Sequence, residues 1–427
     1  MNMSNMVGVG PFLTIPLILS AMGGPQVLIG WILGALLALC DGMIWAELAS
    51  AIPKSGGTFE YLKVAYAGSP LGRLLPFLFI WQFILSGPLE IASGTVGFSQ
   101  YLTSLVPWTM DRWQVQLVAV AVTALAVLLL YRKIESVGLL MVSLWAGVVL
   151  TLTVILVSGL WHFEAAKVFD FPPGAFTLSM GFFLGLGQAM SMSMYDFLGY
   201  YSVCYIGDEV KAPHRNIPLS ILIAVSAVAV IYLTLNVAII SVVPWQEAMK
   251  SEHIGTDFMA RLYGPVGGGL AAALICWTAF ASVFALMLGY SRIPYAAARD
   301  GFFFSVFGRL HPRADFPHVS LLVLGSVTMA VSFFSLEAVI MALMTTRILV
   351  QFVGQIGAVA LIRSRGSMIP PFRMVLYPLP GLIALLGWLY IFATSGTIYI
   401  VAGLGSLAVG LVAFFVWSRI FHGEPRP

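Results

Sequence analysis

The stretch of sequence that decides the fold is residues 7–12, which read VGVGPF and interrupt the first apolar segment of the chain. Two glycines lower the cost of leaving a helix, and a proline removes a backbone donor and clashes with the preceding turn. A second interruption is expected further along, where Gln188, Ser193 and Asp196 crowd into another apolar segment. Irregular backbone at membrane depth is tolerated only where it is buried in protein or lines a wet cavity. The two stretches therefore predict broken helices that meet inside a bundle.

The composition of the chain is that of a membrane protein. Its 427 residues are 60% hydrophobic and only 9% charged, whereas about a quarter of the residues of a soluble protein are charged. The 21 lysines and arginines are scattered against 18 acids, without the basic patch that follows nucleic acid phosphates. A water-soluble class and a nucleic acid partner are excluded. Since no connection is long enough for a soluble catalytic domain, the function must lie among the helices.

Twelve apolar segments are long enough to cross a bilayer. A membrane helix needs about 20 mostly apolar residues to cross about 30 Å of hydrocarbon. Charged residues and Pro- and Gly-rich punctuation separate the segments, which lie at 3–22, 27–51, 74–105, 114–131, 136–161, 176–207, 218–243, 266–290, 318–334, 338–362, 372–394 and 398–420. We therefore predict an all-α integral membrane protein with 12 transmembrane helices.

The distribution of positive charge predicts how the chain is oriented. Lysine and arginine collect in short loops on the cytoplasmic side of a membrane. Sixteen of the twenty-one fall on one side if both termini are cytoplasmic, whereas Arg112, Lys167, Lys250 and Arg261 fall on the other and Arg347 falls within a segment. We expect a multi-pass protein of the cell membrane with its N-terminus and C-terminus in the cytoplasm.

The two interrupted segments are the first and the sixth, which is the spacing expected of a repeat of five helices. Because five is odd, the second copy enters the membrane from the opposite side, so residues 1–161 and 176–362 form inverted repeats and residues 372–420 add two peripheral helices. In such transporters the starts of half-helices face anions and freed carbonyls face cations, which suits a zwitterion. The alternative is that Gly8 and Gly10 only allow close helix packing.

Four stretches resemble the amino acid-polyamine-organocation (APC) permeases. They are 8–12 in the first segment, 47–61 after the second, 208–218 after the sixth and 291–301 after the eighth. The second and third are long and specific, whereas a glycine break alone is a weak motif. The resemblance implies a LeuT-like 5+5 inverted repeat with two peripheral helices, and secondary active transport of amino acids or related amines.

The resemblance also implies a substrate site at the two breaks. Backbone amides for the substrate carboxylate correspond to Gly8, Val9 and Gly10, which agrees with anion binding at a helix start. Carbonyls for the substrate amino group correspond to Met6, Tyr195 and Leu198. Tyr195 also stands where many relatives place an aromatic gate, with ordinary aromatic packing as the alternative.

Four charged residues lie within apolar segments, namely Asp41, Glu90, Asp196 and Arg347. Each costs at least about 2.5 kcal/mol at the centre of a membrane helix unless it is paired or wet. Glu90 and Asp196 are candidate proton carriers, and Asp196 is also a candidate substrate contact, suited to an amine-rich ligand when it is ionised. Arg347 can pair with any one of the three acids, which makes that acid structural. Asp41, which we expect to be structural, is one candidate for this pair.

The residues favour the proton over sodium as the coupling ion. Sodium is not excluded, because Thr278 and Ser282 could ligate it, but two hydroxyls one turn apart are more often helix-packing groups. Several relatives carry a lysine in the fifth segment, in the space where sodium-coupled relatives bind their ion. Residues 136–161 contain no lysine, so coupling through such a lysine is not expected. The three cysteines lie in apolar stretches without metal-ligand spacing and the six histidines lie in connections or at segment ends, so no metal, no cofactor and no enzyme is expected.

These observations predict a permease that imports amino acids across the cell membrane by alternating access with proton symport. Exchange of amino acids or polyamines is the second possibility. A channel needs a continuous polar filter, which the isolated charges do not provide. A non-transporting membrane subunit with a permease fold remains an alternative, because a fold does not establish an activity. The expected partners are a small amino acid or amine and the lipid bilayer, and the oligomeric state is left open.

Overall fold

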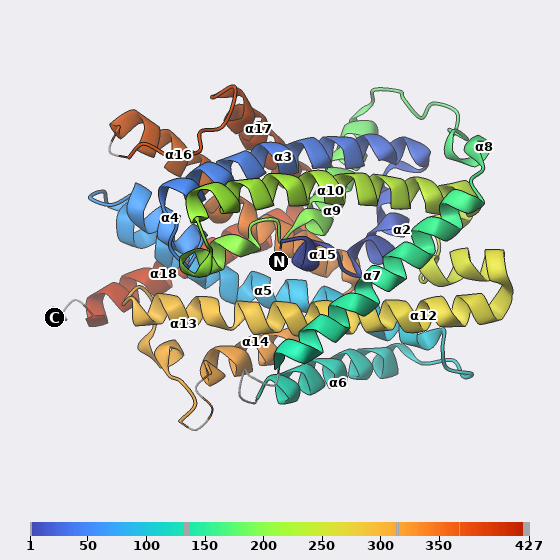
Figure 1. The fold of residues 1–427 in the computed structure, drawn as a ribbon, viewed down its shortest axis with the longest axis horizontal. Helices are drawn as coiled ribbons and strands as arrows, with labels where there is room; N and C mark the ends of the chain where they lie inside the picture. The colour runs from blue at the N-terminus through green and yellow to red at the C-terminus, as the bar shows by residue number, and fades with distance from the viewer. Residues whose placement is uncertain (1, 132–136, 313, 315, 367, 422–427) are drawn as a thin grey trace.

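The computed structural model describes residues 2–131, 137–312, 314, 316–366 and 368–421. Throughout these ranges the regular structure is helical and no strand is present, which confirms the all-α class. The long helices lie roughly side by side along the longest dimension of the molecule (Figure 1). The short helix α1 lies in the middle of that dimension, among the long ones.

The first apolar segment is broken where the glycines and proline predict. Helix α1 (Asn2–Met6) ends before the glycines, and helix α2 (Gly10–Met22) starts at the second of them. The first amide of α2 to bond backwards is that of Phe12, which donates to the Val9 carbonyl at 3.0 Å. The amides of Val9 and Gly10 precede it, and a helix start leaves such groups without an intrahelical partner.

The sixth segment is also broken. Helix α9 (Met180–Phe197) ends at a turn, and the 3₁₀-helix η3 (Ser202–Glu209) follows. Gly199 in the turn has φ +101°, and a Cβ atom there would lie 3.1 Å from the backbone of Asn5 in α1. Glycine is therefore needed both for the left-handed backbone and for the close approach of the two breaks.

The other expected segments each contain a helix. The main ones are α3 (Leu28–Ala51), α5 (Leu71–Thr103), α6 (Arg112–Leu130), α7 (Val137–Trp161), α10 (Pro213–Val242), α12 (Ile254–Tyr290), α14 (His318–Val331), α15 (Leu336–Arg347), α16 (Gly354–Arg365), α17 (Leu379–Thr394) and α18 (Thr397–Phe421). Eight helices within the described ranges are long and apolar enough to cross a membrane, and α2, α14 and α17 are shorter apolar helices. Short helices make up the rest: η1 (Pro25–Val27), α4 (Thr58–Ala65), α8 (Ala165–Val168), α11 (Trp245–Ala248), α13 (Arg292–Arg299) and η4 (Ser305–Gly308).

Two helix starts differ most from the sequence prediction, for visible reasons. Helix α12 begins twelve residues earlier than the expected segment 266–290, but it is kinked at Gly264, where φ is +73°, just before Pro265. The glycine and proline that set the expected start at residue 266 therefore mark a kink within α12 and not its first residue. Helix α17 begins at Leu379 instead of residue 372. The apolar residues before it belong to a connection that packs on the end of α3.

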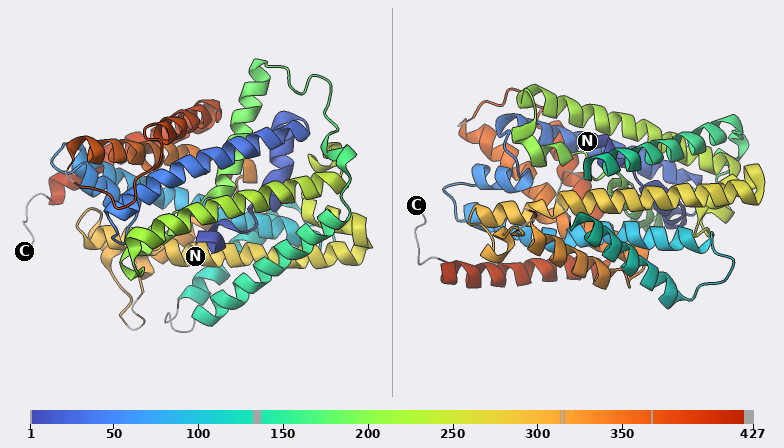
Figure 2. Two further views of the ribbon diagram at one scale, coloured as in Figure 1. Left: turned by 45° about the horizontal axis from the view of Figure 1, so that its top comes forward. Right: turned by 60° about the horizontal axis from the view of Figure 1, so that its bottom comes forward.

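The packing places the two broken segments at the centre. Helix α2 packs on α9, α3 packs on both α9 and α10, and α5 packs on α12 and α15. Figure 2 shows α3 and α10 running side by side. After α15, six residues form a π-helix, η5 (Ile348–Val353), which continues into α16. A π-helical turn inside a helix often marks a functional site, and here it directly follows Arg347.

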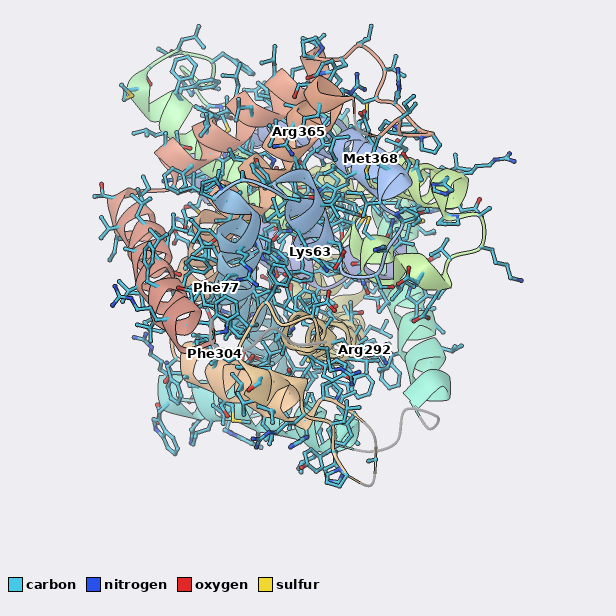
Figure 3. All side chains as sticks on the ribbon, turned by 90° about the vertical axis from the view of Figure 1, so that its left-hand side faces the viewer. Lys63, Phe77, Arg292, Phe304, Arg365 and Met368 are labelled. Carbon is cyan, nitrogen blue, oxygen red and sulfur yellow. The ribbon has the colours of Figure 1, made fainter. Side chains whose placement is uncertain are left out.

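One end of the molecule carries basic residues from several connections. Figure 3 views this end, on which Lys63, Arg292 and Arg365 are labelled. The Lys63 ammonium is 2.7 Å from Asp300 Oδ2 and 2.8 Å from Glu60 Oε1. Partial burial lowers the pKa of Lys63, but the two carboxylates outweigh that effect and raise it above its usual value. The pair joins the connection after α3 to the end of α13.

The same end contains a buried carboxylate that we expect to be a strong determinant of stability. Glu47 is 2% exposed, and its two oxygens accept from Arg363 Nε and Nη2 at 2.6 and 2.7 Å. Its Oε2 also accepts from the Met374 amide at 2.8 Å. Glu47→Ala should lower the free energy of unfolding by about 3 kcal/mol or more, because a guanidinium and an amide lose their acceptor.

Thermal unfolding in detergent checks this expectation. Glu247→Ala is the matched control, because Glu247 also pairs with an arginine, Arg261, at 2.9 Å, but its side chain is 61% exposed. Exposed pairs contribute little, so the control should melt close to the unaltered protein. Equal melting temperatures for the two variants would contradict the anchoring role of Glu47.

Candidate functional site

The two breaks meet around a small cavity of about 40 Å³. Its lining comes from α1, α2, α5, α9, α12 and the connections at the breaks, through Asn5, Met6, Gly8, Val9, Gly10, Glu90, Ser93, Gly94, Tyr195, Asp196, Leu198, Ser282 and Leu286. All seven substrate residues predicted from the sequence are in this set. A cavity needs about 10–15 Å³ of such volume to hold one water molecule, so this one has room for only a few, and a larger ligand requires the lining to move.

A side chain at either glycine of the first break would force a neighbouring side chain to move. A Cβ atom on Gly8 would lie 2.6 Å from Ser282 Oγ, and one on Gly10 would overlap the Oδ1 atom of Asp196. The absence of side chains lets α9 and α12 reach the backbone of the break. The start of α2 is thus exposed to two polar side chains from other helices.

Asp196 is the acid of this site. Its side chain is 3% exposed, and its Oδ2 atom accepts from the Thr14 hydroxyl of α2 at 2.5 Å. Its Oδ1 atom is buried without a hydrogen-bond partner among the described residues. The last turn of α9 places this oxygen against Gly10, at the positive end of the α2 dipole. One carboxyl oxygen of Asp196 is therefore fixed by the hydrogen bond from Thr14, and the other is available to a ligand.

Tyr195 spans the cavity from the neighbouring position of α9. Its hydroxyl lies 2.7 Å from Ser93 Oγ on α5. Its ring comes within 3.7 Å of the place where a Cβ of Gly10 would be. The side chain thus connects the two broken segments to α5 and covers one side of the cavity, which is compatible with the predicted gate and with plain packing.

Two of the three carbonyls predicted to face a substrate amino group, those of Met6 and Tyr195, already have donors. Met6 O accepts from the Tyr232 hydroxyl of α10 at 2.5 Å, and Tyr195 O accepts from the Leu198 amide at 3.1 Å. A carbonyl has two lone pairs, so each can accept once more. Sequence reasoning did not identify Tyr232, because the only sign of its role is a phenol hydroxyl within the apolar segment 218–243.

Arg347 pairs with Glu90. The Arg347 Nη1 atom is 2.6 Å from Glu90 Oε2, and both side chains are buried. The guanidinium also donates from Nε to Ser86 Oγ at 3.1 Å, and the Tyr290 hydroxyl donates to Glu90 Oε2 at 2.8 Å. Of the three acids left open by the sequence, Glu90 is therefore the one neutralised by the arginine. The Glu90 carboxylate lines the cavity, and the Arg347 guanidinium neutralises its charge.

The alternative pair of Arg347 with Asp41 is wrong. Asp41 accepts from the indole nitrogens of Trp45 and Trp388, each at 3.0 Å, and from the Tyr200 hydroxyl. These donors come from α3, α17 and the turn after α9. The carboxylate is satisfied without a cation, so it connects a peripheral helix to the second break. This arrangement is compatible with the structural role that the sequence suggested for Asp41.

The two hydroxyls considered for sodium are engaged in helix packing. Thr278 Oγ1 donates to Leu274 O at 2.9 Å and lies 3.1 Å from Thr151 Oγ1 of α7. Ser282 Oγ donates to Thr278 O at 3.1 Å. Within the described part of the chain, histidine, cysteine and acidic side chains form no group of three that could hold a metal ion.

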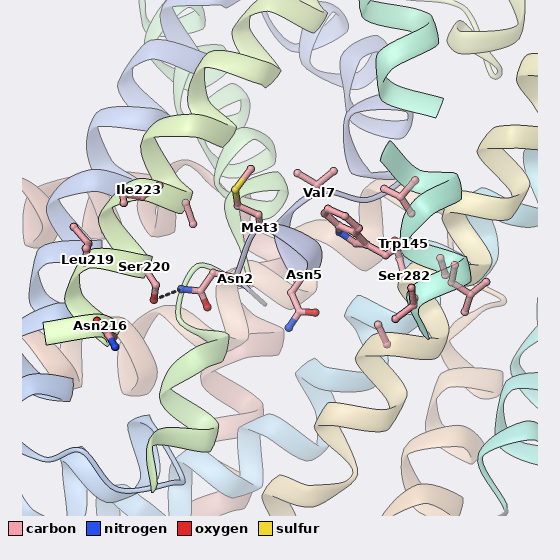
Figure 4. Close-up of a pocket in the computed structure, with 16 residues that line it drawn as sticks. Asn2, Met3, Asn5, Val7, Trp145, Asn216, Leu219, Ser220, Ile223 and Ser282 are labelled. Carbon is pink, nitrogen blue, oxygen red and sulfur yellow. Dashed lines mark hydrogen bonds between the residues drawn. The ribbon is translucent and has the colours of Figure 1, made fainter. Parts of the chain in front are cut away.

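A larger cavity of about 790 Å³ lies beside the small one (Figure 4). Asn5 and Ser282 line both. The larger cavity is bounded by α1, α7, α10 and α12, and it extends to Asn216 near the start of α10. The Asn2 amide donates to Ser220 Oγ at 3.4 Å across its floor. The site is thus separated from a wide space by only a few side chains.

The arrangement defines a class of membrane protein, that of polytopic transporters with a site between two interrupted helices. The comparison with family models agrees, because the model for "Amino acid permease" matches residues 1–420. The chain belongs to this family, whose members are transporters and not enzymes.

Three relatives illustrate the range of the family. The chain is 25% identical to the branched-chain amino acid permease of Bacillus subtilis over 415 residues, covering 93% of this chain and 86% of that one. It is 26% identical to human cationic amino acid transporter 4 over 341 residues, which cover 77% of this chain and 53% of that one. It is 27% identical to mouse Asc-type amino acid transporter 1 over 372 residues, which cover 83% of this chain and 65% of that one. The chain spans about half the length of the cationic transporters it matches.

Proposed function

We propose that this protein is a secondary active transporter that moves amino acids or related amines across the cell membrane by alternating access. The observation that carries the proposal is the meeting of two broken helices around one cavity. The first amides of α2, which have no partner within the helix, converge there with spare carbonyl lone pairs and the Oδ1 atom of Asp196. Such groups bind small charged metabolites in transporters of inverted-repeat design.

The proposal includes twelve membrane spans in the LeuT-like 5+5 arrangement with two peripheral helices. In its support, helices occupy all twelve expected segments, and the interrupted ones are the first and the sixth. The basic end of the molecule in Figure 3 supports a cytoplasmic assignment of that end. The chain is then oriented with both termini inside.

The two cavities support alternating access. The small cavity has room for only a few water molecules, so a substrate needs the lining to open. The larger cavity continues from Asn5 and Ser282 toward the start of α10, which is the cytoplasmic side in the proposed orientation. It is the route by which a bound substrate would leave toward the cytoplasm.

For coupling we propose the proton, with Asp196 as the carrier. Glu90 is held by Arg347 at 2.6 Å, and its carboxylate has no need of a proton to balance its charge. Asp196 has no such cation and keeps one free oxygen beside the substrate groups. Asp196 can therefore change its protonation as the cavity opens and closes.

Uptake by purified protein in liposomes tests the proposal. Radiolabelled amino acids are offered with an inward proton gradient, with an inward sodium gradient, and to vesicles preloaded with unlabelled amino acid. We expect accumulation with the proton gradient that a protonophore abolishes. Uptake that needs preloading would show exchange instead. If no gradient or preload drives uptake, and no amino acid or amine raises the melting temperature in detergent, the proposal fails.

A further inference from the structure

The small cavity has an unbalanced charge. Its described lining contains two acids, Glu90 and Asp196, and no basic residue. Arg347 compensates Glu90 from outside the lining, whereas Asp196 forms no ion pair with any described residue. An ionised Asp196 therefore leaves the cavity with one uncompensated negative charge. In a buried site such a charge is stabilised by a bound cation.

The carboxyl group of Asp196 stands where the resemblance to permeases places the carboxylate of the substrate. It lies against Gly10 at the start of α2 and is fixed there by Thr14. Its Oδ1 atom is buried, unpartnered and part of the cavity wall. The protein thus supplies its own anion to the positive end of this helix. A ligand carboxylate would meet a second negative charge at the same place, which is unfavourable at short distance.

The larger cavity limits what can be attached to the ligand. Its sixteen lining residues include no charged side chain, and most are apolar, such as Val7, Trp145, Val148 and Leu219 (Figure 4). The polar side-chain groups in this lining are amides, hydroxyls and the indole nitrogen of Trp145. A second ammonium group there would lack a counter-charge, whereas a hydrocarbon chain would be favourably buried.

We propose that the preferred ligand is a primary amine with one positive charge, an apolar chain and no carboxylate. The ammonium group pairs with Asp196 Oδ1 in the small cavity, and the chain extends past Asn5 and Ser282 into the larger one. An ammonium offers three donors, and a second acceptor is available from the spare lone pair of the Met6 carbonyl. This inference rests on the proposed transport function and names the substrate class for it. Because the ammonium group pairs with ionised Asp196, a bound amine and a bound proton exclude each other at this carboxyl group, and an amine is moved in exchange for the proton.

Matched ligand pairs test the inference. Leucine is compared with 3-methylbutylamine, and phenylalanine with phenethylamine, so that each pair differs only in the carboxylate. Affinity is measured by calorimetry and by thermal stabilisation of the detergent-purified full chain. We expect each amine to bind about tenfold or more tightly than its amino acid. Cadaverine, which carries a second ammonium, should bind more weakly than pentylamine.

Asp196→Asn should reverse the preference. The amines lose their counter-charge and should bind about tenfold or more weakly, while the amino acids no longer meet a second carboxylate and should bind equally or better. Asp41→Asn is the matched control, because Asp41 is also a buried carboxyl but lies outside both cavities and is satisfied by two indoles and a hydroxyl. Its ratio of amine to amino acid affinity should equal that of the unaltered protein.

Several outcomes would overturn the inference. It fails if the unaltered protein binds the amino acid of each pair more tightly, or if Asp196→Asn folds and keeps the original ratio. If that variant does not fold, the ratio for the unaltered protein decides alone. Tight amine binding without uptake would sink the transport proposal and leave the ligand class standing. Binding of neither class would overturn both.

Discussion

Gly10→Ala should weaken binding of any stabilising amino acid or amine by about tenfold or more while the protein remains folded. A Cβ atom at this position would overlap Asp196 Oδ1, and the carboxyl carbon of Asp196 would lie only 3.2 Å away. The acid must turn away and lose its hydrogen bond from Thr14, or the start of α2 must shift. Either change separates the two groups that the cavity brings together.

A glycine in an ordinary helical position provides the comparison for Gly10→Ala. Gly269 lies within α12, and a Cβ atom there would meet nothing within 4 Å. Gly269→Ala should therefore leave binding unchanged and can slightly stabilise the helix. Binding is measured by calorimetry on detergent-purified protein, and folding by gel filtration and melting. Equal affinities for the two variants would show that the contact between Asp196 and the first break is not needed for binding.

The breaks themselves could be predicted from the sequence because their causes are local. Glycine and proline in residues 7–12 weaken the helix wherever it is placed, and the structure interrupts it there. The second break falls two residues after Asp196, and Gly199 supplies the left-handed turn. The polar residues before it had indicated the region but not the exact turn. Local chemistry thus predicted where the backbone is irregular.

The partners of the buried charges could not be predicted in the same way. Spacing along one helix shows which residues share a face, but not which other helix that face meets. Arg347 could have reached any of three acids, and only the packing of α15 against α5 selects Glu90. Asp41 is satisfied by Trp45 and Trp388, whose indole donors count as apolar in a hydropathy profile. Long-range packing, and not composition, decided these pairs.

The same difference between local and long-range causes appears at the carbonyls. The resemblance to the APC permeases implies that Met6 O faces the amino group of the substrate. In the folded chain, Tyr232 from a segment more than two hundred residues away donates to it. The break supplies the group, and the surrounding helices determine how much of it remains available to a ligand. A substrate site made of backbone therefore needs the whole bundle for its definition.

Arg347→Met is expected to have the largest effect on stability, lowering the free energy of unfolding by about 3–5 kcal/mol. The variant leaves Glu90 buried without a counter-ion, and Tyr290 alone would still donate to it. The lost guanidinium also donates to Ser86 at 3.1 Å and lies 5.7 Å from the centre of the Phe83 ring. Removing one partner of a buried pair is costly because an uncompensated charge remains.

The double variant separates the charge effect from the loss of packing. Glu90→Gln with Arg347→Met removes both charges, and replacing both partners of a buried pair is often near neutral. We therefore expect the double variant to melt well above the Arg347→Met single variant. Arg261→Met serves as the control, because its pair with Glu247 at 2.9 Å lies at the surface with both side chains at least 43% exposed, where pairs contribute little. A double variant as unstable as the sum of its single variants would contradict the pairing.

The same double variant bears on which acid carries the proton. If Glu90 is only the counter-ion of Arg347, as the 2.6 Å contact supports, uptake by the folded double variant should still respond to an imposed proton gradient. Asp196 keeps its place against Gly10 and Thr14 in that variant, because neither residue contacts the altered pair. Asp196→Asn, in contrast, should uncouple uptake from the gradient. Loss of the proton response in the double variant, with Asp196 intact and the protein folded, would move the carrier role to Glu90.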